Sequence, residues 1–248
     1  MCYNLPGKVT QLKNGVSKTM KKLYEGKTKN VMLDEETGIV HLFFKDDATG
    51  ENGVFDPGSN TVGGSVEGKG KVGLEVSKYF FELMEKNGIP THYLGADVEQ
   101  GLMKVRNLTV PRLEFIVRYF TAGSMCRRFT LEEGIPFNPP YAEVTLKDDI
   151  QGDPLISERI CLMKGILKEG QYEEAQNVVL RVGEVLKEEL ASMNLQLIDF
   201  KIEVGYDETG KMFVADEITP DIWRVRDENG NIPNQLDCSK MLLEKMGL

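Results

Sequence analysis

The stretch LQLIDFKIEVGYDETGKMFVADEITPD, residues 195–221, predicts two antiparallel strands joined by a tight turn. Residues two apart share a face of a strand, so the apolar residues of 198–204 take one face and the charged residues take the other. The sequence Asp-Glu-Thr-Gly at 207–210 is typical of a turn that reverses the chain. This stretch therefore predicts a β-hairpin with one apolar and one charged face.

The charged face of this hairpin is the first candidate functional site. If the first and fourth residues of the turn pair, Lys201 lies opposite Asp216, and Asp199 and Glu203 lie diagonal to it. Such a face is typical of solvated salt bridges. It is also typical of a metal and phosphate site, because divalent cations prefer carboxylate oxygens and Lys can neutralise a phosphoryl oxygen. A slip of one residue would send Asp216 to the apolar face. Further acidic residues and Arg224 follow just past the strand end, where scaffolds often present functional groups.

Outside the hairpin, the sequence predicts a strand-rich first half and a second half that contains a long helix, which indicates an α+β fold. The predicted elements are a strand–turn–strand in LYEGKTKNV (23–31), a hairpin in VMLDEETGIVHLFF (31–44), a helix around 72–84, two strands in LMKVRNLTVPRLEFIVRYF (102–120) and a helix over about 172–193. Residues 46–70 and 131–153 are predicted to be mostly irregular, because they are rich in glycine, proline and acidic residues.

Composition narrows the class of protein and of partner. The 248 residues include 30 Lys and Arg against 39 Asp and Glu, a net charge of −9, which argues against nucleic acid or an anionic membrane as the main partner. No apolar run is long enough to span a membrane, and the N-terminal segment lacks the apolar region of a signal peptide. The four cysteines lie far apart, which predicts reduced thiols in a cytoplasmic protein. Both histidines, His41 and His92, are predicted to be structural rather than catalytic.

Two further segments combine small residues with basic ones, which is typical of phosphate sites. In the first, Gly26 permits close backbone approach between two predicted strands, and Lys27 and Lys29 supply positive charge. A surface hairpin turn is the alternative interpretation. In the second, the strand that carries Arg118 runs into an Ala-Gly-Ser turn ending at Ser124. The hydroxyl and the N–H groups of a following helix could bind an anion there.

Taken in order, these segments resemble the SAICAR synthetase family, ligases of purine biosynthesis. The resemblance rests on LYEGKTKNV, GKG at 68–70 with the helix leading to GIPTH, LEFIVRYFTAGS, GIPFNPP, DFKIEVG and DEITPDIWR. It covers residues 22–227, and the motifs are specific in combination rather than singly. It implies that ATP phosphorylates the carboxylate of carboxyaminoimidazole ribotide and that the amine of L-aspartate attacks the acyl phosphate, with Mg²⁺ as cofactor.

The resemblance also implies roles for individual residues. Gly26, Lys27 and Lys29 would contact the nucleotide phosphates, and Glu114 would line the nucleotide pocket. Glu203 and Asp216 would hold Mg²⁺, with Lys201 at the reacting phosphate and carboxylate. Arg118, Ser124 and Arg224 would bind the ribotide phosphate. Asp199 and Asp221 would complete the catalytic set with Lys201, contacting substrate or supporting residues that do.

The same resemblance implies an α+β architecture in two parts. Residues 1–110 would form an antiparallel-sheet lobe like the small lobe of protein kinases, and residues 111–248 an ATP-grasp-like α+β domain that carries the metal and ribotide site. The active site would lie in the cleft between them. The expected partners are the small-molecule substrates, with a second copy of the chain as a further candidate.

Some positions depart from the family pattern. The sequence after Asp221 has Trp223 and Arg226 where the family usually has a small or polar residue and Trp, and Gly152 replaces a usual His. These departures concern the choice of substrate more than the ATP chemistry. A paralogous ligase or a small-molecule kinase acting on a related phosphorylated carboxylate therefore stays open as an alternative.

Overall fold

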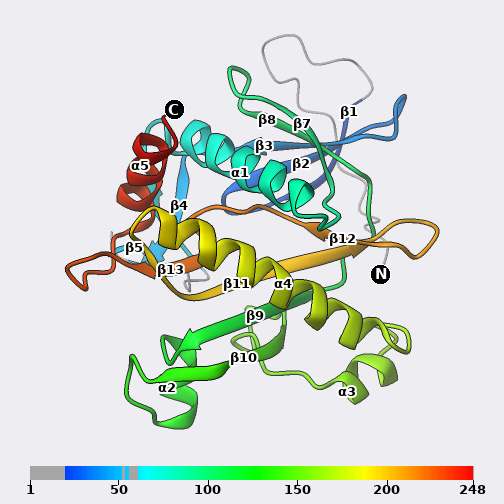
Figure 1. Cartoon of the computed structure of the whole chain (residues 1–248). Coiled ribbons are helices and arrows are strands. Elements are labelled where there is room, and N and C mark those ends of the chain that lie inside the picture. The colour runs from blue at the N-terminus through cyan, green and yellow to red at the C-terminus, as the bar shows by residue number, and fades with distance from the viewer. Residues whose placement is uncertain (1–19, 52–53, 56–60, 248) are drawn as a thin grey trace.

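The computed structural model describes residues 20–51, 54–55 and 61–247, which form a mixed α/β fold with antiparallel sheets (Figure 1). The first sheet has the strand order β1-β2-β3-β8-β7. Its strands are β1 (Met20–Glu25), β2 (Lys29–Asp34), β3 (Val40–Phe44), β7 (Tyr93–Asp97) and β8 (Leu102–Val105). All neighbouring strands are antiparallel, so the two hairpins predicted within residues 23–44 are confirmed.

A small sheet follows in a segment that the sequence predicted to be mostly loop. It has the order β5-β4-β6, with β4 (Asp47–Glu51), β5 (Val54–Phe55) and β6 (Val62–Ser65). The prediction of a mostly irregular 46–70 was therefore wrong. Strand β6 contains two adjacent glycines, Gly63 and Gly64, which leave no side-chain alternation to read, while backbone pairing with β4 still forms.

The second sheet has the order β10-β9-β11-β12, and β13 also pairs with β11. Its strands are β9 (Leu113–Phe120), β10 (Pro136–Leu146), β11 (Gln196–Tyr206), β12 (Met212–Ala215) and β13 (Trp223–Arg226). Strand β10 contradicts the irregular structure predicted for 131–153. It lies at the sheet edge, and its pairing with β9 skips from Pro136 to Tyr141, so Pro139 and Pro140 fall where no ladder bond is needed.

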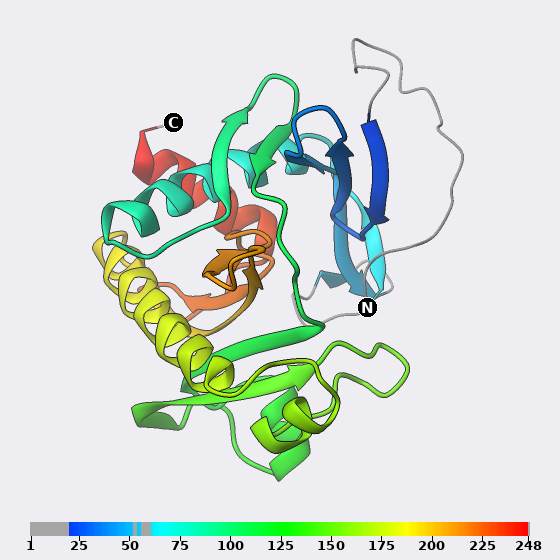
Figure 2. The same ribbon diagram turned by 90° about the vertical axis from the view of Figure 1, so that its right-hand side faces the viewer.

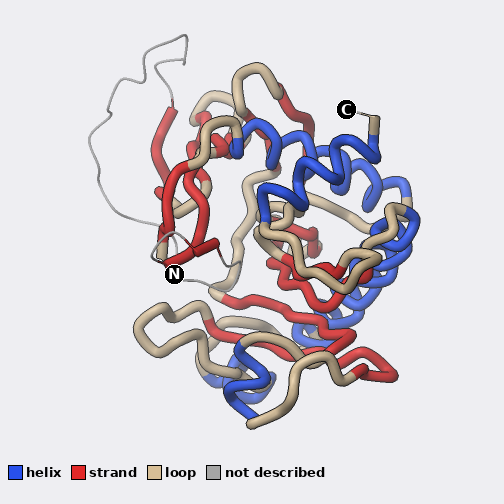
Figure 3. Tube along the Cα trace, turned by 90° about the vertical axis from the view of Figure 1, so that its left-hand side faces the viewer, coloured by secondary structure: helices blue, strands red, loops and turns tan. Residues whose placement is uncertain are grey.

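Helices cover these sheets mostly from one side of the molecule (Figure 3). Helix α4 (Gln171–Ser192) packs its buried stripe, including Val179, Val182 and Leu186, against β9 and β11, as the helical spacing predicted (Figure 2). Helix α1 (Lys69–Lys86) packs against the first sheet and against α5 (Gln235–Met246). Two short helices, α2 (Ser124–Phe129) and α3 (Glu158–Met163), complete the fold.

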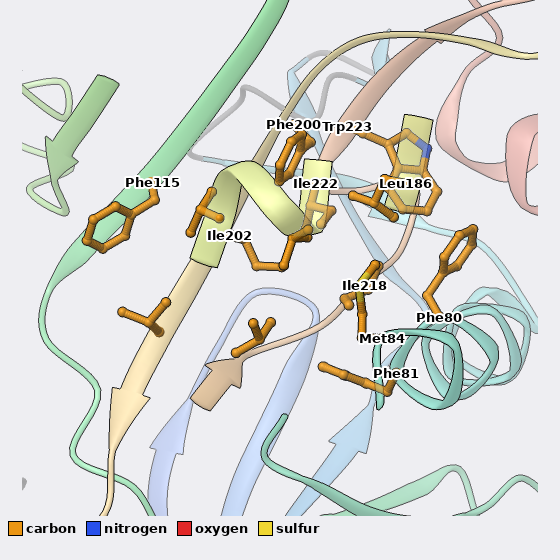
Figure 4. Packing of buried hydrophobic residues seen from close by; sticks show 14 of the residues in the cluster. Phe80, Phe81, Met84, Phe115, Leu186, Phe200, Ile202, Ile218, Ile222 and Trp223 are labelled. Carbon is orange, nitrogen blue, oxygen red and sulfur yellow. The ribbon is translucent and has the colours of Figure 1, made fainter. Parts of the chain in front are cut away.

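One hydrophobic core joins the two larger sheets (Figure 4). Phe80 of α1 meets Trp223 of β13 edge to face, with ring centroids 5.1 Å apart, and both side chains are buried. Two isolated bridges, Thr91 to Val214 and Thr109 to Tyr206, tie the segments around the first sheet to the hairpin of the second. The hairpin that carries the predicted site is therefore held rigidly between the sheets.

Two predictions from the composition can be compared with the structure. In the residues that the structure describes, no helix is long and apolar enough to cross a membrane. Cys126, Cys161 and Cys238 are buried free thiols, in agreement with the predicted absence of disulfides among them. Cys2 and the N-terminal segment examined for a signal peptide lie outside the described residues.

Candidate active site

The register of the β11–β12 hairpin differs by one residue from the prediction. Glu203 pairs with Ala215, because the Asp207 N–H donates to the Lys211 carbonyl at 3.0 Å and the turn is one residue longer than expected. The predicted pairing of Lys201 with Asp216 was therefore wrong. At the observed register a continued strand would send the Asp216 side chain to the apolar face.

Asp216 nevertheless reaches the charged side. Strand β12 ends at Ala215, and Asp216 has a left-handed φ of +73°, which turns the chain out of the strand. Its Oδ1 lies 2.8 Å from Nζ of Lys29, a buried residue of β2 in the first sheet. A local backbone turn, rather than strand alternation, thus brings Asp216 to the site.

Two lysines and three carboxylates form what we call the carboxylate–lysine cluster: Lys29, Lys147, Glu203, Asp216 and Glu217. Nζ of Lys29 lies 2.8 Å from Oε1 of Glu217 as well as from Asp216, and Lys147 Nζ donates to Glu203 Oε1. The cluster joins β2 of the first sheet to β11, to the end of β10 and to the segment after β12.

Burial and mutual charge shift the pKa values within this cluster. Burial, then the negative charge of Asp216, raises the pKa of Glu203 to about 7, although Lys147 acts in the opposite direction. Burial also acts to raise the pKa of Asp216, but Lys29 and Lys147 outweigh it and hold this pKa below its usual value. Asp216 is therefore held ionised beside Glu203, which is readily protonated. A divalent cation bound between them could stabilise both carboxylates in the ionised form.

His92 supports the same region from the first half of the chain. It is buried, and its backbone N–H donates to the Val214 carbonyl at 2.9 Å. Burial lowers the pKa of His92 to about 4, so the ring is neutral near pH 7. A buried neutral ring agrees with the structural role predicted for it.

Lys201 and Glu114 form the next contact along β11. Lys201 shares a face with Asp199 and Glu203 because the three alternate along one strand. Its Nζ donates to Oε1 of Glu114 at 3.2 Å, and its side chain is 34% exposed, compared with 10% for Lys29. Lys201 therefore presents a more accessible ammonium group than Lys29 does.

A second group, the arginine cluster, consists of Arg118, Glu143, Asp199 and Arg224. Strand β11 lies between β9 and β13, so Asp199 pairs with Arg118 on one side and with Arg224 on the other. Asp199 accepts from Arg118 Nη1 at 2.5 Å and from Arg224 Nη1 at 2.9 and 3.1 Å. The register of three strands thus brings both predicted arginines onto one buried carboxylate.

Arg118 is committed to contacts within the protein. Its side chain is 2% exposed, and its Nε and Nη2 both donate to Glu143, at 3.0 and 2.7 Å. Its remaining N–H groups reach Asp199, the Ala122 carbonyl and, at 3.4 Å, the Ser124 hydroxyl. These contacts occupy the five donors of a guanidinium, so the geometry favours Arg118 as a support for its neighbours.

Arg224 is more accessible than Arg118 and lies beside a cavity. Its side chain is 22% exposed, and it helps to line a cavity of about 330 Å³ together with Gly123, Arg127 and Asn234. Gly123 has φ +59° and ψ −129°, and a Cβ there would lie 2.8 Å from Nη2 of Arg224. The glycine of the Ala-Gly-Ser turn therefore makes room for the arginine head group.

The remaining predicted residues lie around the carboxylate–lysine cluster. Gly26 makes the tight turn between β1 and β2, where its N–H donates to the Lys29 carbonyl at 2.8 Å. Lys27 lies 3.6 Å from Asp149, in the loop that follows Lys147. Asp221 does not join either cluster directly; its Oδ2 lies 2.5 Å from Nζ of Lys69 at the start of α1.

Sequence reasoning missed Glu143 and Lys147. Both belong to the stretch around β10 that was predicted to be irregular because of its prolines. The run Tyr141 to Lys147 alternates, with Ala142, Val144 and Leu146 on one face and the polar residues on the other. That alternation was the signal for a strand whose polar face carries both residues into the site.

Comparison with known proteins gives a consistent result. The sequence model of the SAICAR synthetase family matches residues 22–242. The chain is 40% identical over 212 residues to the phosphoribosylaminoimidazole-succinocarboxamide synthase of Finegoldia magna, covering 86% of this chain and 88% of that protein. It is also 40% identical over 230 residues to the enzyme of that name from Clostridium tetani, covering 91% and 100%.

Solved structures agree with the sequence relatives. A SAICAR synthetase in complex with ADP superposes with a TM-score of 0.80 at 30% identity, covering 90% of this chain and 96% of that one. The phosphoribosylaminoimidazole-succinocarboxamide synthase of Ehrlichia chaffeensis superposes with a TM-score of 0.82 at 26% identity, covering 92% and 98%.

Proposed function

Because the chain belongs to the SAICAR synthetase family, a family of ligases, we propose that it joins L-aspartate to the carboxylate of carboxyaminoimidazole ribotide in an ATP-dependent reaction. The observation that carries this proposal is the arrangement of both clusters along β11. Asp199, Lys201 and Glu203 alternate on one face, and a strand rises about 3.3 Å per residue, so the two ends lie roughly 13 Å apart. This separation suits a ribotide whose phosphate and reacting carboxylate are held at opposite ends.

The carboxylate–lysine cluster is the end we assign to ATP. Lys29 and Lys147 would neutralise phosphate oxygens, with Gly26 and Lys27 in the turn beside them and Glu114 at the edge of the nucleotide pocket. The ADP complex of a related SAICAR synthetase supports nucleotide binding by this fold. We propose that the site lies between an N-terminal lobe, residues 1–110, and a C-terminal domain, residues 111–248. The contact of Lys29 with Asp216 supports this position.

Glu203 and Asp216 fit a magnesium ion. They are two neighbouring, partly buried carboxylates, and carboxylate oxygens are the protein ligands that Mg²⁺ prefers. Within the described residues no group of three or more His, Cys, Asp and Glu side chains is placed to hold a metal, so phosphate oxygens and water would supply the other ligands. When bound, the ion would neutralise charge on the transferring phosphoryl group.

The proposed reaction has two steps. A carboxylate oxygen of the ribotide attacks the γ-phosphorus of ATP; the new O–P bond forms as the bond to ADP breaks. The aspartate amine then attacks the acyl carbon, inorganic phosphate leaves, and the nitrogen loses a proton. Lys201, whose ammonium group is accessible, would stabilise negative charge on the carboxylate and the phosphoryl group in both steps.

The arginine cluster is the end we assign to the ribotide phosphate. Arg224 and Ser124 would bind its oxygens, because Arg224 is partly exposed beside the cavity. Arg118 and Asp199 would hold these two residues in place through the contacts described above. Asp199 would then contribute to binding through its neighbours, and Asp221 would lie against the ribotide between the two ends.

The test is a reconstituted reaction that follows three products. The protein is incubated with the ribotide, ATP, Mg²⁺ and L-aspartate, and ADP, free phosphate and the amide product are measured. Release of phosphate and amide only when both acid and amine are present supports the ligase. Formation of ADP with phosphate retained on the product would indicate a kinase, and comparable rates with asparagine would indicate a paralogue of altered amine specificity.

A matched pair of variants ties the activity to the site. Asp216→Asn removes one charged ligand while nearly preserving shape, so turnover should fall by at least tenfold with little loss of fold, and more steeply at limiting Mg²⁺. Glu208→Gln, on the exposed turn of the same hairpin, should behave like the wild type. Equal activity of Asp216→Asn and wild type at limiting Mg²⁺ would rule out the metal assignment.

A further inference from the structure

A buried lysine outside both clusters begins helix α1. Lys69 is 8% exposed, and its Nζ lies 2.5 Å from Oδ2 of Asp221, whose side chain is 11% exposed. Lys69 belongs to the helix that packs on the first sheet, whereas Asp221 lies in the segment between β12 and β13 of the second sheet. The pair therefore joins two parts of the fold that meet at the proposed active site.

Stability alone does not account for this pair. A cation in the first turn of a helix faces the positive end of the helix dipole, which is unfavourable for Lys69. Removing two charges from water is costly, and apolar replacements of buried ion pairs are often as stable as the pair. A charged pair in this place is therefore better explained by what it does for the site than by what it adds to folding.

The start of α1 is held firmly, so Lys69 has little freedom. The next residue, Gly70, donates its N–H to Oδ1 of Asp46 at 2.9 Å. A Cβ on Gly70 would lie 3.0 Å from the carbonyl carbon of Lys45, so the helix start is pressed against that backbone. The lysine is thus presented to Asp221 from a fixed position.

Asp221 has an unused acceptor. Its Oδ1 is buried and has no hydrogen-bond partner, while Oδ2 is occupied by Lys69. Its own N–H donates to the Thr219 hydroxyl at 3.2 Å, which fixes the backbone from which the carboxylate projects. Buried polar atoms in folded proteins are nearly always paired, so this oxygen lacks an N–H or O–H donor. The preceding residue, Pro220, lines the cavity beside Arg224 that we assign to the ribotide.

We propose that Lys69 is a positioning residue. It holds the Asp221 carboxylate turned so that Oδ1 accepts a hydrogen bond from an N–H or O–H group of the bound ribotide. This inference rests on the proposed function and adds a residue to it. Because Lys69 acts through Asp221 alone, its removal should weaken ribotide use without changing nucleotide binding.

The experiment is a double-mutant cycle on the full-length protein with Lys69→Met, Asp221→Asn and the combined variant. For each, KM and kcat are measured for ribotide, ATP and aspartate, ADP affinity by calorimetry, and unfolding by urea. We expect kcat/KM for ribotide to fall roughly 10- to 100-fold in Lys69→Met, with ADP affinity within about twofold of wild type. The combined variant should be no worse than Asp221→Asn alone.

Two further variants complete the design. Lys69→Arg keeps the charge and should recover part of the ribotide kcat/KM. Lys71→Met removes a lysine two residues along the same helix, whose partner Glu99 is exposed, and should match the wild type throughout.

Three outcomes would overturn the inference: additive losses in the combined variant, equal losses for all three substrates that follow a loss of stability, or unchanged ribotide kinetics in Lys69→Met. Failure of the proposed function is separate, because it would show as wild-type protein that forms no amide from ribotide and aspartate. In that case the inference falls with the function on which it rests.

Discussion

Replacement of Asp199 by Asn tests whether this carboxylate anchors the two arginines or takes part in the reaction itself. Asp199 is 3% exposed and accepts from Arg118 through Oδ2 and from Arg224 through both oxygens. Asn keeps the shape but loses the charge. It also directs an NH₂ donor at one of the guanidinium groups.

The expected loss of stability follows from these contacts. Breaking a buried ion pair by removing one partner typically costs about 3–5 kcal/mol. Arg118 keeps both bonds to Glu143, so we expect the lower part of this range, about 3 kcal/mol in the free energy of unfolding. Arg224 donates to both oxygens of Asp199 and lies beside the cavity, so KM for ribotide should rise more than kcat falls.

Urea unfolding followed by tryptophan fluorescence measures the stability change. Trp223 is the one tryptophan in the sequence, is buried, and directly precedes Arg224 in β13. The urea dependence of the unfolding free energy should be unchanged, so the midpoint alone shifts. Glu208→Gln serves as the exposed control on the turn of the same hairpin.

One result would refute this reasoning. If the unfolding free energy of Asp199→Asn stays within about 0.5 kcal/mol of wild type while kcat collapses at saturating ribotide, Asp199 acts on the reacting atoms. The arginines would then be held by other contacts, and the catalytic role first predicted for Asp199 would be the better description.

Three other predictions follow from the same geometry. Gly123→Ala places a methyl group 2.8 Å from Arg224 Nη2, so KM for ribotide should rise about tenfold with ADP affinity unchanged; an unchanged KM would mean that the guanidinium has room elsewhere. The pKa of Glu203 is raised to about 7, so the folded protein binds the carboxyl proton more tightly than the unfolded chain does. In the absence of metal, the free energy of unfolding should therefore fall by roughly 3 kcal/mol as the pH rises from 4.5 to 7. Glu203→Gln should abolish this fall in urea titrations. The pKa of His92 is lowered to about 4, so the stability that depends on its neutral ring is complete above pH 6.5 and is lost as the pH falls towards 4. His92→Leu should remove this loss of stability in acid. An unaltered dependence of stability on pH would contradict the shift.

The elements that carry the site were largely readable from the sequence, whereas their pairing was not. Alternation in 198–204 predicted the face that Asp199, Lys201 and Glu203 share. The register depended on one extra residue in the turn, set by the bond between Asp207 and Lys211, which no residue preference distinguishes from the shorter turn. Asp216 therefore reached the predicted side through its backbone conformation and not through the predicted pairing.

Sequence patterns alone could not predict which residues from distant parts of the chain meet in the site. Arg118 and Arg224 meet on Asp199 because three strands from distant parts of the chain align there. Glu143 stayed hidden because prolines concealed an edge strand, although its alternation was present. The family resemblance identified Arg118 as a candidate site residue, whereas the structure shows that it contacts Glu143 and Asp199.

The turn at Asp216 has an evolutionary consequence. A left-handed backbone is readily adopted only by Gly, Asn and Asp, so few amino acids can end β12 in this way. Gly would bring no side chain, Asn would bring no charge, and Glu would keep the charge at a conformational cost. Backbone geometry and charge thus leave this position without a conservative exchange. A lineage could alter it only by rebuilding the turn and supplying another carboxylate in the same step.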